Sequence, residues 1–78
     1  MPTVLRVGPH RFFCYSRESN EPPHIHVRTG ERAAKFWLVP IALARATGYN
    51  HRELSHLARI VSDNRSAFLE AWHDHLGN

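Results

Sequence analysis

Polar and apolar side chains alternate along His24–Arg28, in which Ile25 and Val27 stand between polar neighbours. A period of two is typical of a β-strand with one buried face, so both histidines are expected on one face, about 6.5–7 Å apart along the strand. Three more strands are predicted over residues 3–7, 10–15 and 32–38, and the stretch over 10–15 is rich in aromatic residues. The turn signals Gly8-Pro9 and Thr29-Gly30-Glu31 indicate two hairpins.

Apolar side chains follow a different period in the last third of the chain. They recur every three or four residues, at Leu54, Leu57, Ala58, Val61, Phe68, Trp72 and Leu76. This spacing is typical of an amphipathic helix. Asn50 and Glu53 match a capping box at its start, and Gly77 suits a position just past its end. The sequence therefore predicts one long helix that runs to about His75.

Between the strands and this helix, Ile41–Ala46 is predicted to form one or two helical turns. Pro40 ends the preceding strand, and Gly48 suits the residue that closes a helix. The pattern as a whole predicts a single domain over residues 1–78 with an α+β fold. It consists of a small four-stranded, mainly antiparallel sheet of two hairpins, with one long C-terminal helix packed on one face.

The composition is that of a globular protein, with 42% hydrophobic and 22% charged residues. No apolar run approaches the ~18 residues of a membrane span. The single cysteine, Cys14, provides no internal disulfide framework, so we expect a cytoplasmic protein. A chain of 78 residues buries only about 60–65% of its unfolded surface, and a homodimer would add stability. The net charge of +3 fits an acidic partner, nucleic acid or protein, and equally a solvated basic surface.

The paired histidines His24 and His26 are the strongest candidates for chemistry. They follow Pro22 and Pro23, which restrict the backbone on the approach to the strand. Two imidazoles can act as general base and acid on a bound substrate. They can also supply two metal ligands, which Glu21 and His10, or the same pair from a second chain, would complete. A third interpretation is a pair of surface histidines with no role. No glycine-rich phosphate loop, CxxC pair or HExxH motif is present.

Basic and aromatic residues nearby suggest contact with RNA. Lys35 and Trp37 share one face of their predicted strand, and Arg28 shares a face with the histidines. A tryptophan beside a lysine can stack a base and contact a phosphate, although Trp37 also suits the core. A further group of arginines falls in the predicted helical part and could contact phosphates: Arg45, Arg52, Arg59 and Arg65.

Several segments together resemble a family of small bacterial proteins catalogued as a domain of unknown function. The resemblance covers nearly the whole chain. It rests on Pro2-Thr3-Val4, Arg11-Phe12-Phe13, Tyr15-Ser16, Glu21-Pro22-Pro23-His24-Ile25-His26-Val27, Ala34-Lys35-Phe36-Trp37-Leu38 and Trp72. The Pro-Pro-His-Ile-His-Val core is the hallmark of that family. Its members are often encoded beside a second small uncharacterised protein, so the resemblance implies a toxin–antitoxin-like pair with a small protein partner. It brings no established catalytic residues.

Two hypotheses of different classes follow. The first is a toxin–antitoxin component that acts as a metal-independent ribonuclease, without a cofactor. His24 and His26 would be its general base and acid, while Arg28 or Lys35 stabilises charge on the phosphate and Trp37 helps to bind the substrate. The second is a non-enzymatic module of such a pair, in which the histidine strand binds a protein or nucleic acid and Trp37 anchors the interface. A third, weaker hypothesis is a metal site shared across a dimer, in which two histidines from each chain supply the four ligands.

Overall fold

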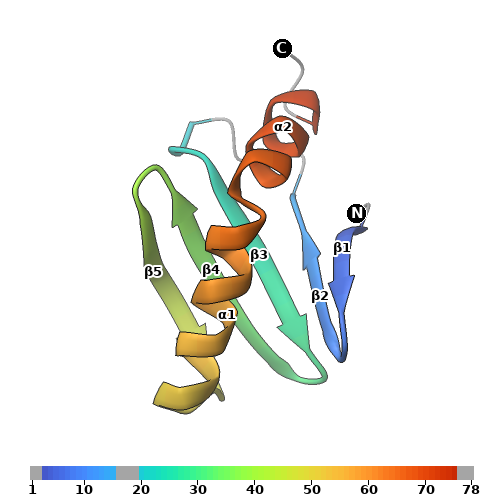
Figure 1. Cartoon of the computed structure of the whole chain (residues 1–78). Helices are drawn as coiled ribbons and strands as arrows, with labels where there is room; N and C mark the ends of the chain where they lie inside the picture. Colours follow the sequence, from blue (N-terminus) through green and yellow to red (C-terminus); the bar gives the residue numbers. More distant parts are fainter. Residues whose placement is uncertain (1–2, 16–19, 76–78) are drawn as a thin grey trace.

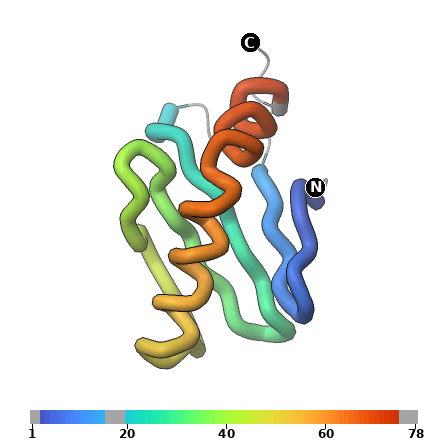
Figure 2. The backbone as a smooth tube through the Cα atoms, in the orientation of Figure 1, coloured from blue at the N-terminus to red at the C-terminus, as the bar shows by residue number. Residues whose placement is uncertain are grey.

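The computed structural model describes residues 3–15 and 20–75. Their elements follow one another as β1 (Thr3–Val7), β2 (His10–Phe13), β3 (His24–Thr29), β4 (Arg32–Leu38), β5 (Ile41–Thr47), α1 (His51–Asp63) and α2 (Arg65–His75). The strands form one antiparallel sheet whose spatial order is the order of the chain. Both helices lie across the same side of that sheet (Figures 1 and 2). The predicted α+β architecture with an antiparallel sheet and a C-terminal helical layer is confirmed.

The predicted helical turns at Ile41–Ala46 are wrong, because this segment forms β5. It pairs along its length with β4, from Ala33 opposite Thr47 to Leu38 opposite Ile41, with a bulge where Phe36 follows Lys35. The alanine-rich segment has a local preference for helix, and pairing with the neighbouring strand overrides it. The sheet therefore has five strands where the sequence predicted four.

The predicted single long helix is also wrong, because the helix is interrupted at Asn64. The backbone N–H and the side-chain amide of Asn64 both donate to the carbonyl oxygen of Ile60, at 3.1 and 2.8 Å. The carbonyl oxygen of Asn64 then accepts from the N–H of Phe68, which starts α2. Ser62, Asp63 and Asn64 favour local side-chain hydrogen bonds over continuous helix, which explains the break. The predicted capping box is confirmed at Asn50.

The core lies between the sheet and the helices. Ile25 and Val27 from β3 and Phe36 and Leu38 from β4 point to the helix side and are essentially inaccessible to solvent. Leu57, Val61 and Phe68 close over them, and the rings of Phe12 and Phe68 stack with their centroids 5.3 Å apart. Burial of these side chains removes most of the apolar surface that the helices carry. None of the described helices is long and apolar enough to cross a membrane.

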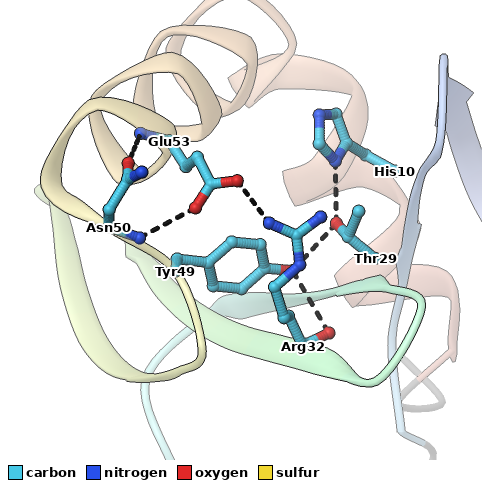
Figure 3. Close-up of polar contacts among 6 residues, drawn as sticks. All are labelled: His10, Thr29, Arg32, Tyr49, Asn50 and Glu53. Atoms are coloured by element: carbon cyan, nitrogen blue, oxygen red, sulfur yellow. Dashed lines mark hydrogen bonds and ion pairs between the residues drawn. The ribbon is translucent and has the colours of Figure 1, made fainter.

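A cluster of polar side chains fastens the start of α1 to the sheet (Figure 3). Arg32 from β4 pairs with Glu53 of α1, and the Nδ1 atom of His10 lies 2.7 Å from Oγ1 of Thr29. The hydroxyl of Tyr49 lies 2.9 Å from the same Oγ1. The backbone N–H of Asn50, and then the Arg32 guanidinium, hold the pKa of the Glu53 carboxyl below its ordinary value. Burial, with His56 and Arg32 nearby, lowers the pKa of His10.

Four residues named above from the sequence, Pro2, Ser16, Leu76 and Gly77, lie outside the described residues, because residues 1–2, 16–19 and 76–78 are not described.

Candidate nucleic-acid interface

The side of the sheet opposite the helices is called the open face here. Residues that stand directly opposite one another in antiparallel strands point to the same face, so the register assigns its members. Arg6 stands opposite Arg11, Arg11 opposite Arg28, and His26 opposite Lys35. The open face thus carries Arg6, Arg11, Phe13, His24, His26, Arg28, Ala33, Lys35, Trp37, Arg45 and Thr47.

Cationic side chains form two cross-strand rows on the open face. Arg6, Arg11 and Arg28 make the first row, across β1, β2 and β3. Lys35 and Arg45 face each other in the second, across β4 and β5. Like charges placed directly opposite destabilise a sheet. Among the described residues, none of the four arginines forms an ion pair with a carboxylate. The open face is therefore a concentration of positive charge, and its four arginines have no carboxylate partner in the described part of the fold.

His26 lines a pocket of about 210 Å³ in the open face, together with Tyr15, Arg28, Lys35, Arg45 and Thr47. Its ring stacks on Phe13 at a centroid distance of 5.6 Å and meets the edge of Tyr15 at 4.5 Å. His26 lines the pocket although only 6% of the residue is exposed, so its imidazole forms part of the pocket floor. The pocket thus combines one histidine with three cationic side chains.

Lys35 is held from two sides. Its Nζ atom lies 2.5 Å from Oε1 of Glu21 and 4.7 Å from the centre of the Trp37 ring. The lysine is buried and Trp37 is partly exposed. Glu21 is thereby the one described carboxylate that contacts a cation of the open face. A phosphate that approached Lys35 would compete with Glu21 for the lysine.

His24 lies at the end of the open face and is only 1% exposed. Its Nδ1–H donates to the carbonyl oxygen of Pro22 at 2.9 Å, since a carbonyl can only accept. The ring meets Trp72 of α2 at a centroid distance of 4.6 Å and Trp37 at 5.7 Å. The neighbouring Pro23 carbonyl accepts from the N–H of Leu38 at 3.0 Å, which ties the proline segment to the end of β4. These contacts connect β3, β4 and α2.

The structure brings together all five residues that the sequence nominated: His24, His26, Arg28, Lys35 and Trp37. The register places His24 opposite Trp37 and His26 opposite Lys35, which the sequence left open. His10, a candidate metal ligand, lies on the helix side beside Thr29 instead. Glu21 lies 3.7 Å from Nδ1 of His24. Within residues 3–15 and 20–75, no group of three or more His, Cys, Asp or Glu gathers in a way that could hold a metal.

Sequence reasoning missed part of the open face. Arg6 and Arg11 were not nominated, and the register places both on the open face. Arg45 was assigned to a helical strip of arginines, and it lies on β5. Arg65, from the same strip, donates its Nε–H to the carbonyl oxygen of Leu38 at 2.7 Å. That bond gives Arg65 a structural contact within the fold.

Comparison with known proteins identifies the family of this chain and nothing further. No curated protein and no solved structure matches the chain. The family described as Domain of unknown function (DUF4160) matches residues 10–73, from the start of β2 into α2, and includes all the nominated site residues. The chain therefore belongs to the DUF4160 family of domains of unknown function.

Proposed function

We propose that this protein is a cytoplasmic, non-enzymatic RNA-binding component of a toxin–antitoxin-type pair, and that single-stranded RNA lies across the open face. The observation that carries the proposal is the row of Arg6, Arg11 and Arg28, with Arg45 in the neighbouring row. None of these four arginines has a carboxylate partner among the described residues. Such a row costs stability in the free protein, and a bound polyanion would remove that cost.

The shape and the aromatic residues of the open face favour a single strand. Adjacent strands lie about 4.8 Å apart, so the three-arginine row spans about 10 Å, which is enough for two or three successive phosphates. Trp37 and Tyr15 are partly exposed beside the cations, where bases can stack on them. Aromatic stacking next to arginine and lysine is the usual way to hold an unpaired strand. The pairing with a second small protein rests on the family resemblance described above.

Ribonuclease activity is the second candidate, because His26 lies beside Lys35 at the floor of a cationic pocket. His26 would act as general acid and His24 as general base, with Arg28 or Lys35 stabilising the phosphate charge. The burial of His24 against Trp72 and its bond to Pro22 favour a structural role for that histidine. Binding without cleavage is therefore the better supported function.

The test of RNA binding compares two double variants that remove the same charge. Arg28→Gln/Arg45→Gln alters the open face, and Arg52→Gln/Arg59→Gln alters two exposed arginines of α1. Fluorescence anisotropy with a labelled oligouridine measures the affinity of each. We expect a large loss from the open-face variant and a small one from the α1 variant. Equal losses would show that binding follows net charge alone, and the proposal would then fail.

Variants of His24 and His26 test whether the protein cleaves RNA and is toxic, or only binds RNA. The wild type, His26→Gln and His24→Gln/His26→Gln are expressed in bacteria, and growth and total RNA integrity are followed, with circular dichroism to check folding. We expect intact RNA in every culture. RNA breakdown in the wild type that disappears in the folded His26→Gln variant would establish the ribonuclease instead.

A further inference from the structure

A second, apolar surface lies at the edge of the sheet formed by β5, opposite the edge formed by β1. β5 is the last strand in the sheet order of the described residues, so its outer edge carries backbone groups with no strand beside them (Figure 1). The two exposed large hydrophobic side chains of the described residues are Val39 and Leu43, 52% and 45% exposed, and both lie on or next to this strand. Both exposed apolar side chains therefore belong to the same edge of the sheet.

A groove of about 240 Å³ runs between β5 and α1, on the helix side of the sheet. Phe36, Ile41 and Leu43 line its sheet wall, and Leu54, Ser55 and Ala58 line its helix wall. This groove has room for an aliphatic side chain. Any strand added next to β5 would send alternate side chains into the groove and the others to the open face, beside Arg45 and Thr47.

We propose that this edge binds an extended segment of a partner protein in which apolar and acidic side chains alternate. The segment would pair with β5 as a sixth strand, with its apolar side chains in the groove and its carboxylates next to Arg45. Charge complementarity selects the acidic residues, because Arg45 of β5 is exposed on the open face and has no carboxylate partner among the described residues. This docking surface is separate from the arginine row proposed for RNA, except that Arg45 borders both.

A second copy of the chain fits the same edge less well. Antiparallel pairing of two β5 strands about Ala44 would place the bulge of each strand on the two-fold axis. It would also bring both copies of the exposed Arg45 to the seam on the open face, where like charges repel. An acidic segment meets neither obstacle.

The test uses synthetic peptides of about seven residues, the length of a typical strand. One peptide alternates valine with glutamate, and two controls alternate valine with glutamine or with lysine. Binding to the full chain is measured by fluorescence anisotropy up to ~1 mM peptide. We expect the glutamate peptide to bind more tightly than the glutamine peptide, and the lysine peptide to bind weakest. No saturable binding by the glutamate peptide, or equal binding by all three, would overturn the proposal.

Variants locate the peptide on the edge. Leu43→Glu and Ser55→Glu place a carboxylate on the sheet wall and the helix wall of the groove, and we expect each to weaken binding at least tenfold. Ser66→Glu, which makes the same change at an exposed position of α2, is the matched control. Both groove variants should keep the RNA affinity of the wild type. Peptide binding that is unchanged in the groove variants would refute the site.

The oligomeric state decides between the two occupants. Sedimentation velocity of the wild type is expected to show a monomer. A dimer that Leu43→Glu converts to a monomer, while Ser66→Glu does not, would assign the edge to a second copy and overturn the proposed partner.

Discussion

Salt dependence is the most quantitative prediction of RNA binding by the open face. Each phosphate that an arginine neutralises on a single strand contributes a slope of about −0.7 to the plot of log affinity against log salt concentration. Arg6, Arg11, Arg28 and Arg45 have no carboxylate partner among the described residues, whereas Lys35 is paired with Glu21. Four contacts therefore give a slope of about −2.8.

This slope means that the affinity falls about 50-fold between ~50 and ~200 mM salt. The Arg28→Gln/Arg45→Gln variant keeps two of the four contacts, so its slope should be about −1.4 and its loss about sevenfold over the same range. Anisotropy titrations with the labelled oligouridine at four or more salt concentrations measure both slopes. The α1 variant Arg52→Gln/Arg59→Gln should keep the slope of the wild type. A wild-type slope near zero, or the same reduced slope in both variants, would refute the assignment of the phosphates to the open face.

Three further predictions concern single residues. Gly48→Ala should destabilise the fold by about 1–3 kcal/mol in urea denaturation, because Gly48 has a φ of +91° and a Cβ there would lie 2.6 Å from Cγ of Arg32. Gly8→Ala is the control: Gly8 also has a positive φ, but a Cβ there would meet open space, so this variant should cost less stability. Equal losses of stability in the two variants would exclude a role for the contact with Arg32. Glu21→Gln should raise the RNA affinity about 1.4- to 5-fold by releasing Lys35, and an unchanged or lower affinity would contradict this. The lowered pKa of His10 means that the folded chain binds fewer protons than the unfolded chain as pH falls below about 6.5, so the stability of the fold drops there. His10→Gln should therefore reduce the fall in melting temperature between about pH 7.5 and pH 5.5. Identical falls in the wild type and the variant would count against this role of His10.

The local patterns in the sequence were sufficient for most of the fold. Alternation of polar and apolar residues located β3, and the glycine turn between β3 and β4 is confirmed, with Gly30 at a φ of +61°. The capping box located the start of α1 because its signal lies in the side chains of Asn50 and Glu53 themselves. Features that depend on residues close in the chain were therefore predictable.

Most of the failures concern features set by distant partners, and the helix break at Asn64 is the local exception. β5 is alanine-rich, and only its pairing with β4 makes it a strand, so the assignment of Arg45 to a helix failed with it. The break at Asn64 escaped notice because the apolar spacing from Val61 to Phe68 is seven residues, which is compatible with continuous helix. For the candidate site, alternation placed the two histidines on one face, but the register that brings Lys35 and Trp37 opposite them is a long-range property.

The order of the sheet has a consequence for how the chain folds. Because each strand pairs with the next one along the chain, every strand pairing closes a short loop, apart from the longer connection between β2 and β3. Low sequence separation of contacts favours fast folding, and the meander can grow strand by strand as it leaves the ribosome. The helices that cover its apolar side come from the final third of the chain. During synthesis, Ile25, Val27 and Phe36 are thus exposed to solvent until α1 and α2 emerge, which makes the nascent sheet a natural client for chaperones.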